Sequence, residues 1–190
     1  MELTSITPDA AGLKALAHPV RLRILGLLRT EGPATSTTLA TRLGLNTGAT
    51  SYHLRQLAQH GFIADDLARG NGRDRWWRAA HQSTATGPAE PADAEGQRNL
   101  DAFLQAAAVH HTEQLQRAME ERPLLPEEWR AATELSDWVV ALTPTRARAL
   151  VDALIAVIDD TVEDESEEAA HFVLQLTAYP LPGRLGGEPG

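Results

Sequence analysis

The chain has 190 residues, of which 43% are hydrophobic and 23% charged, a composition that favours folded domains with a packed core. It contains no cysteine, which excludes disulfides, thiolate nucleophiles, zinc ribbons and thiol-based sensing. Residues 1–80 carry ten Lys or Arg against six Asp or Glu, and residues 81–190 carry seven against twenty, so the net charge of −9 comes from the second half. Because the sequence has neither a long apolar run nor a signal-peptide pattern, we expect a cytoplasmic protein.

The N-terminal segment predicts three short helices. Apolar residues over 13–17 indicate the first, and Pro19, which suits the first helical position, opens an apolar second helix. A Glu-Gly-Pro turn ends this helix. Thr35 or Ser36 can cap the third, and Gly44 supplies the left-handed residue at its end.

A fourth helix is expected over Thr47–Gln59, with Asn46 as its N-cap. Thr50, Leu54 and Leu57 recur at i, i+4 and i+7, so this face should turn inward. A helix, a glycine-containing turn and a second helix form the supersecondary pattern typical of DNA-binding proteins.

A hairpin is predicted after the fourth helix. Residues 62–64 and 75–78 indicate two short strands, joined by a turn with Asn71-Gly72 at its centre. Trp76 and Trp77 are adjacent and therefore face opposite sides of a strand. We expect one in the core and the other over the dimer helix or another neighbour.

Three sequence stretches carry a family resemblance: LAHPVRLRILGLL, LATRLGLNTGATSYHLRQLAQHGFI and the hairpin GRDRWWRA. They resemble the winged-helix repressors of the ArsR-like class, particularly their larger actinobacterial relatives. The resemblance covers about residues 10–80. It implies a winged helix-turn-helix, DNA as a partner and a homodimer.

The exposed face of the fourth helix is expected to read base edges in the major groove. Its groove-facing residues are predicted to be Thr47, Gly48, Ser51, Tyr52 and Arg55. The resemblance adds His53, the third residue of an S-x-H-L motif. For His53, packing or a backbone contact stays open beside a base contact.

Arginines on the hairpin form the predicted wing contacts to phosphate or the minor groove, as wings do in the family. They are Arg69 and Arg73 near the tip, and Arg75 and Arg78 beyond it. The alternative is that Arg75 and Arg78 pair with acidic wing residues, for which Asp65, Asp66 and Asp74 are available.

Residues 82–96 are rich in Ala, Thr, Pro, Gly and acids and predict a linker. It would join a DNA-binding domain at 1–81 to a dimerisation and possible effector domain at 97–190. An apolar stripe predicts a long helix over Gln97–Glu121. By the resemblance this helix dimerises, through Leu100, Leu104, Ala107, His111 and Leu115.

A short helix carrying Trp129 is expected next, followed by a β-α-β unit with strands at 138–142 and 172–178 and a helix from Thr143-Pro144 to about Val162. The expected fold class is thus mainly α with small β, an α+β chain. The helix and strands could enclose an apolar effector, or they could pack as structure and enlarge the dimer interface.

Other chemistry has little support in the sequence. His110 and Glu113 share a helix face and are the weak metal candidates, but a closed zinc site usually needs four ligands. The acidic run 159–168 could hold a hard cation, although such runs are usually solvated. A Ser-His-Asp order, a phosphate loop, a dinucleotide fingerprint and an H-E-x-x-H motif are all missing, so we expect no enzyme and no cofactor.

These features predict a sequence-specific transcriptional regulator, preferably a repressor. It would bind double-stranded DNA as a homodimer on an inverted repeat, two recognition helices entering successive major grooves. Two alternatives stay open: a winged-helix module that binds a protein, and a version of the regulator that responds to a metal or small-molecule effector.

Overall fold

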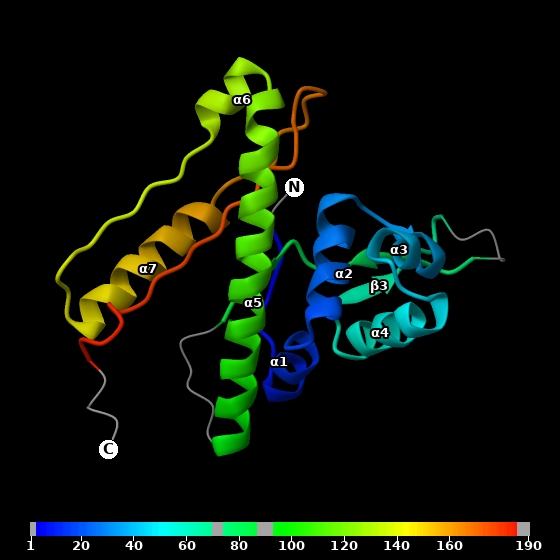
Figure 1. Cartoon of the computed structure of the whole chain (residues 1–190), viewed down its shortest axis with the longest axis horizontal. Helices are drawn as coiled ribbons and strands as arrows, with labels where there is room; N and C mark the ends of the chain where they lie inside the picture. Colours follow the sequence, from blue (N-terminus) through cyan, green and yellow to red (C-terminus); the bar gives the residue numbers. More distant parts are fainter. Residues whose placement is uncertain (1–2, 70–73, 87–92, 186–190) are drawn as a thin grey trace. The chain divides into compact units, whose positions relative to one another are not determined.

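The computed structural model describes residues 3–69, 74–86 and 93–185, and its contacts divide the chain into two compact units (Figure 1). The larger unit is Leu3–Glu134, and the other is made essentially of Leu135–Gly190. We describe each unit by itself. None of the helices in the described ranges is long and apolar enough to cross a membrane.

Among its described residues the larger unit contains six α-helices, one 3-10 helix and five short strands. In chain order they are β1 Ser5–Ile6, α1 Ala10–Leu16, α2 Pro19–Thr30, β2 Ala34–Thr35, α3 Ser36–Leu43, α4 Thr47–Gln59, β3 Ile63–Asp65, β4 Trp76–Ala79, β5 Ser83–Thr84, α5 Ala94–Glu121, the 3-10 helix η1 Arg122–Leu124, and α6 Glu127–Ala132. The predicted fold class, mainly helical with small sheets, is confirmed.

Side-chain caps set the starts of the helices as the sequence predicted. Thr35 Oγ1 accepts a hydrogen bond from the backbone N–H of Thr38, and Asn46 Oδ1 accepts one from Ala49, so α3 and α4 begin where expected. Pro19 occupies the first turn of α2. Gly44 ends α3 with φ of 66°, in the left-handed region that glycine adopts without steric cost.

Two small sheets join segments that are distant in sequence. Strands β2, β4 and β3 form an antiparallel sheet in which Asp65 lies opposite Trp77 and Thr35 opposite Trp76. The predicted hairpin is therefore present, although its Asn71-Gly72 turn lies outside the described residues. Strand β1 pairs in parallel with β5, which fastens the N-terminal segment to the chain that leaves the hairpin.

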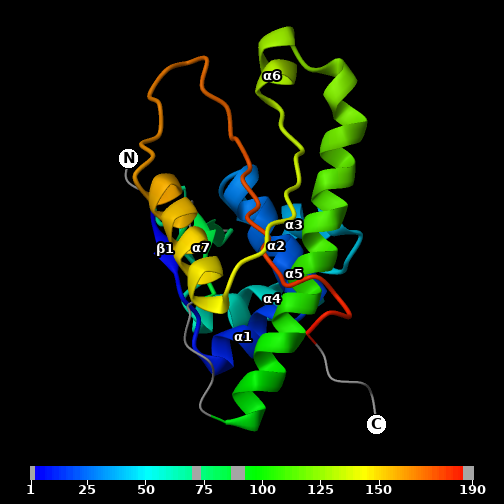
Figure 2. The ribbon, with the colours of Figure 1, turned by 90° about the vertical axis from the view of Figure 1, so that its left-hand side faces the viewer.

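The core lies between α1, α2, α3, α4 and the base of the hairpin. Its fully buried side chains are Leu16, Ile24, Leu25, Leu39, Leu54, Leu57, Phe62 and Thr50. Helix α5 runs along α1 and α2 and adds Phe103 to this core (Figure 2). Trp77 is buried and Trp76 is not, so the predicted division of the two tryptophans between opposite sides is confirmed.

The grouping of α5 with α1 and α2 differs from the domain limits that the sequence suggested. The predicted linker 82–96 contains β5 and the first turn of α5, while residues 87–92 lie outside the description. The contacts place the division at Glu134 and Leu135, and not between 81 and 97. The physical reason is that one face of α5 completes the apolar core formed with α1 and α2.

The C-terminal unit has one helix, α7 Pro144–Asp159, with Thr143 as its N-cap, as predicted. The strand predictions at 138–142 and 172–178 are wrong for this structure. The described residues form two sheets, and neither segment belongs to one of them. Their composition favours strands, but a strand also needs a hydrogen-bonded neighbour, and neither segment joins a sheet of the described residues.

Candidate nucleic-acid interface

Helix α4 presents one buried face and one polar face, as its sequence predicted. Thr50, Leu54 and Leu57 are completely buried. Thr50 Oγ1 also donates a hydrogen bond to the Asn46 carbonyl oxygen, at 3.1 Å, so the buried hydroxyl has a partner. The helix is thereby held at a fixed rotation about its axis, which decides which side chains can face a ligand.

The opposite face of α4 carries most of the predicted groove-facing residues. Thr47, Gly48, Tyr52 and Arg55 are exposed, and Ser51 is half-buried. Tyr52 has 51% of its surface exposed. On a helix in a major groove, hydroxyl and phenol groups can donate to or accept from base edges, and a guanidinium group can donate to them.

Gly48 has a local role in the start of α4. A Cβ atom placed there would lie 3.3 Å from Asn46 Oδ1, the oxygen that caps the helix. The missing side chain therefore leaves the cap undisturbed. It also leaves the exposed backbone of the first turn open to close approach by a phosphate or a base.

His53 lies against helix α2 and not on the open face of α4. Its ring centroid is 4.6 Å from that of His18, and its Nδ1 atom is buried. Burial lowers the pKa of His53, and the nearby His18 and Arg21 lower it further. The His53 side chain therefore packs within the protein, which was one of the alternatives left open for it. The Tyr52 ring meets the His53 ring edge-on, with 5.5 Å between the ring centroids.

His18 is a residue whose role sequence analysis missed. Its Nδ1 atom accepts a hydrogen bond from the backbone N–H of Val20, at 3.2 Å, and so caps α2. Burial and then Arg21 lower its pKa, which keeps the imidazole neutral and able to accept. The His18-Pro19 pair marked the helix start, but no sequence pattern linked His18 to His53.

Arg75 on the wing is occupied by an ion pair within the protein. Its guanidinium binds the Asp65 carboxylate through two nitrogens, one of them at 2.7 Å. It also lies over Trp77, with Cζ 4.1 Å from the ring centroid. The hydrogen bond from Arg75 lowers the pKa of Asp65. For Arg75 the structure thus shows the predicted alternative, a pair with an acidic wing residue, and not a guanidinium that is free to bind phosphate.

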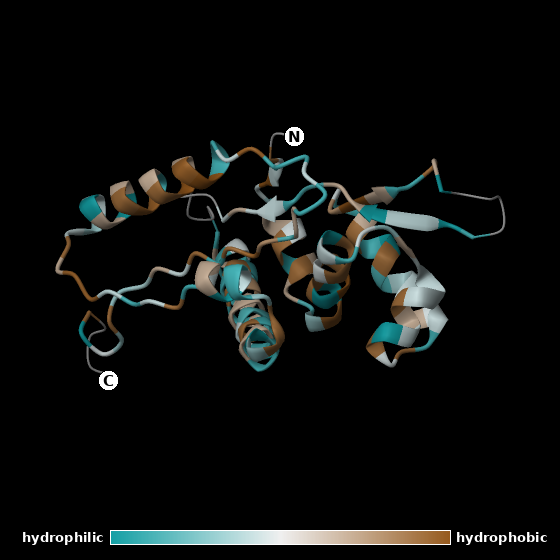
Figure 3. Ribbon diagram, turned by 90° about the horizontal axis from the view of Figure 1, so that it is seen from above, coloured by the Kyte–Doolittle hydropathy of each residue, from teal (hydrophilic) through white to brown (hydrophobic). Residues whose placement is uncertain are grey.

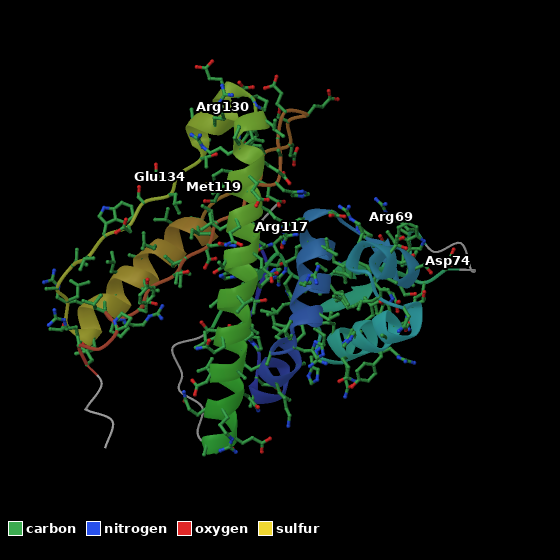
Figure 4. All side chains as sticks on the ribbon, in the orientation of Figure 1. Arg69, Asp74, Arg117, Met119, Arg130 and Glu134 are labelled. Carbon is green, nitrogen blue, oxygen red and sulfur yellow. The ribbon has the colours of Figure 1, made fainter. Side chains whose placement is uncertain are left out.

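Arg69 is held more loosely near the end of the described wing. Its Nε lies 3.5 Å from Asp66 Oδ2, and its Cζ lies 5.9 Å from the Trp76 ring centroid. Figure 4 shows Arg69 and Asp74 at the end of the hairpin that is remote from α5. Arg78 is exposed, and Arg73 lies outside the described residues. Arg69 and Arg78 are therefore the described wing cations that are less firmly bound within the protein than Arg75.

Arg29 positions the chain after the wing and was also missed. From α2, its Nε donates to the His81 carbonyl oxygen and its second guanidinium nitrogen donates to Thr84 Oγ1, both at 2.9 Å. Burial lowers its pKa to about 10. Arg29 is one of three arginines in α2, and the sequence gives no signal that distinguishes it as the one with a distant partner.

The predicted dimer stripe on α5 is split between two environments. Leu100 and Ala107 pack against the core beside Phe103, so they lie within the subunit. Leu104 is 45% exposed, and His111 and Leu115 are half-buried. Val109, outside the predicted stripe, is 58% exposed. The exposed part of the predicted stripe is therefore narrower than expected and keeps Leu104, while Val109 lies on another side of the helix.

His110 packs against α2 at a glycine. A Cβ atom on Gly26 would lie only 3.1 Å from His110 Nε2, so the missing side chain makes room for the imidazole. Burial lowers the pKa of His110. Glu113 is exposed on the same helix. Across the described ranges, no group of three His, Asp or Glu side chains is arranged to hold a metal, so His110 and Glu113 gain no third ligand.

The comparison with protein families matches residues 16–66 to a helix-turn-helix domain. This range includes α2, α3, α4 and β3, which are the elements that build the polar face described above. No curated protein matches the chain.

Several solved structures are similar over part of their length. Reduced HlyU from Vibrio cholerae is 22% identical over 50% of this chain and 83% of its own, with a TM-score of 0.33. A possible transcriptional regulator for arsenical resistance is 26% identical over 56% and 93%, with a TM-score of 0.33. A mutant of ZitR from Lactococcus lactis is 16% identical over 75% and 83%, with a TM-score of 0.34.

The domain match and the observed hairpin agree with the resemblance read from the sequence. The match supplies the helix-turn-helix, and strands β2, β3 and β4 supply the wing beside it. Residues 16–66 of this chain therefore form a helix-turn-helix domain.

Proposed function

We propose that the protein is a cytoplasmic repressor that binds duplex DNA as a homodimer, with α4 of each subunit in a major groove of an inverted repeat. The observation that supports this most directly is the polarity of α4. Tyr52 and Arg55 are exposed on one side, while Leu54 and Leu57 are completely buried on the other. A helix anchored in this way can enter a groove without losing its own core.

Base readout is assigned to Thr47, Ser51, Tyr52 and Arg55. An arginine can donate two hydrogen bonds to a guanine, and hydroxyl groups can bind several bases. His53 contributes indirectly, because its ring holds α4 against His18 on α2. We assign it a positioning role and not a base contact.

Phosphate contacts are assigned to the wing and to the backbone of the first turn of α4. Arg69 and Arg78 are the described wing residues that can reach DNA, while Arg75 stays bound to Asp65. Each phosphate contact releases counterions, so binding should weaken steeply with salt.

Dimerisation is assigned to the exposed side of α5 on which Leu104 lies. A two-fold axis along this helix would present two copies of α4 to DNA, and the operator would then have matching symmetry. Repression follows if this dimer occupies a site that the transcription machinery needs.

The test begins with selection of bound sequences from random duplexes by the purified full chain. The recovered duplex is then titrated by fluorescence anisotropy with wild type, Arg55→Ala and Arg130→Ala. Arg130 is the matched control because it removes the same charge at the far end of α5, away from α4 (Figure 4). Arg55→Ala should weaken binding by about 1–3 kcal/mol, and Arg130→Ala should leave it unchanged.

Two outcomes would contradict the proposal. If no sequence is enriched and binding is insensitive to salt, the winged helix serves as a protein-interaction module. If a sequence is enriched but Arg55→Ala and Arg130→Ala behave alike, α4 is not the recognition helix.

A further inference from the structure

The imidazole rings of His18 and His53 face each other where α2 meets α4. Their centroids are 4.6 Å apart, and the ring planes are inclined by 51°. His18 is the N-cap of α2, and His53 lies in the middle of α4. The two rings therefore join the proposed recognition helix to the helix that supports it.

The Nδ1 atoms of both rings lie where a proton is unfavourable. His18 Nδ1 accepts the backbone N–H of Val20, at 3.2 Å, and needs its lone pair to do so. His53 Nδ1 is buried and has no hydrogen-bond partner among the described residues. A neutral imidazole suits both places with its proton on Nε2, whereas an imidazolium carries a proton on each nitrogen. Protonation would therefore break the cap of α2 at one ring and bury an unpaired donor at the other.

The fixed charge beside the two rings is positive. Arg21 of α2 is held in place because its guanidinium donates to the carbonyl oxygens of Ala15 and Lys14 at the end of α1. Burial lowers the pKa of both imidazoles, Arg21 lowers both further, and His18 also lowers the pKa of His53. No carboxylate of the described residues raises either pKa. An added proton would thus meet a cation with no anion to offset it.

We propose that His18 and His53 form a proton-sensitive link, which holds α4 in its DNA-binding position and releases it on acidification. Tyr52 connects this link to the surface of α4, because its ring meets the His53 ring edge-on and is 51% exposed. When the two imidazoles separate, Tyr52 loses its support and the exposed face of α4 shifts against α2. Leu54 and Leu57 are completely buried on the other side and keep the helix in the core.

The expected direction is opposite to the general effect of pH on DNA binding. Protonated histidines add positive charge, so a protein without such a link binds the DNA polyanion more tightly as the pH falls. With the link, acid populates a released form in which both imidazoles have ordinary pKa values of about 6.5. The folded pair resists protonation, so the DNA-binding form is favoured above that pH and is lost as the pH falls below it.

The link regulates the proposed recognition helix, so this inference rests on the proposed function and uses the duplex recovered in the selection above. Fluorescence anisotropy measures the Kd of the full chain at pH 7.5, 6.5 and 5.5 and at constant ionic strength. Wild type should bind about tenfold more weakly at pH 5.5 than at pH 7.5. Far-UV circular dichroism at each pH confines the comparison to the folded chain.

A double variant, His18→Asn with His53→Asn, removes both titrating rings. Asparagine is a good N-cap, so its side-chain oxygen can replace His18 Nδ1 as the acceptor for the N–H of Val20. Relative to its own Kd at pH 7.5, the double variant should bind equally well or more tightly at pH 5.5. His18→Asn alone should lose part of the weakening, which keeps the test available if the double variant does not fold.

His171→Asn is the matched control. It removes an exposed imidazole of the C-terminal unit, outside α2 and α4, and should retain the weakening seen in wild type. Loss of the weakening in this variant would indicate a general effect of histidine charge and would overturn the inference.

Two further outcomes overturn the inference. One is a wild-type affinity that is constant or increases on acidification. The other is a weakening that persists in the folded double variant, since other groups would then cause it. Absence of binding at pH 7.5 contradicts the proposed function itself, whereas normal binding at pH 7.5 with the wrong pH dependence contradicts only the proton-sensitive link.

Discussion

The two units use similar side chains to very different effect. Leu54 on α4 is completely buried, whereas Leu154 on α7 is 43% exposed, although each lies in a helix with a well-formed cap. The larger unit surrounds its apolar residues with five helices and a hairpin, and α7, along which Figure 3 shows many hydrophobic residues, is the one helix among the described residues of the C-terminal unit. Helix formation therefore follows local sequence, but burial depends on how many other elements are available to pack.

The largest expected effect comes from removing core volume. Leu54→Ala should lower the free energy of unfolding by about 2–5 kcal/mol, because it deletes buried methyl groups and leaves a cavity. Leu154→Ala should cost less than about 0.5 kcal/mol in the monomer, as surface substitutions do. Urea denaturation followed by circular dichroism measures both. Equal costs for the two variants in the monomer would show that α7 has a core of its own, and the contrast between the units would be wrong.

A pH titration should affect the larger unit. Burial lowers the pKa of His18, His53, His110 and His111, and all four lie in this unit. Below about pH 6.5 the unfolded chain binds protons that the folded state resists, so stability is present above that pH and is lost as the pH falls. Thermal unfolding at pH 7.5, 6.5 and 5.5 should show a falling midpoint.

One histidine can be removed from this set. His53→Asn should flatten the pH dependence, because it removes an imidazole whose pKa burial lowers. A midpoint that is constant from pH 7.5 to 5.5 would mean that the histidines are fully solvated in the folded state.

Local signals in the sequence were enough to predict the winged-helix elements. The caps at Thr35 and Asn46, the proline at position 19 and the glycine at position 44 each act within a few residues, so their effect can be read without a structure. The inward face of α4 followed from spacing alone. These predictions hold because each is decided by interactions between near neighbours in the chain.

Predictions that needed distant partners were less successful. The contact of His53 with His18 and the hydrogen bonds of Arg29 to His81 and Thr84 join separate elements, and no local pattern marks them. The strands at 138–142 and 172–178 were predicted from composition, but a strand also needs a neighbour to pair with. The sequence predicted the apolar stripe on α5. Which residues of the stripe are buried in the core and which are exposed depends on where α1 and α2 pack, and the sequence does not show that.

A smaller effect is expected from the cap of the recognition helix. Asn46→Ala removes the side-chain oxygen that accepts the N–H of Ala49, at 2.8 Å, and should cost about 1 kcal/mol of stability. Thr143→Ala removes the corresponding cap of α7. It should leave the main unfolding transition unchanged, because α7 lies in the other unit. Chemical denaturation of both variants tests this, and Asn46→Asp, which retains the cap, should restore most of the loss.

The smallest expected effect concerns two exposed ion pairs. Arg75 with Asp65 joins strands β3 and β4, so a double-mutant cycle on this pair should give a coupling of about 0.2–1 kcal/mol in the main unfolding transition. Arg148 with Asp152 lies within a single turn of α7, and its cycle should give no measurable coupling in that transition. Both cycles should be run by urea denaturation at low and high salt, because screening reduces surface pairs. A larger coupling energy for Arg148 with Asp152 than for Arg75 with Asp65 would mean that the two units unfold in one transition. The contrast drawn between the two units would then be wrong.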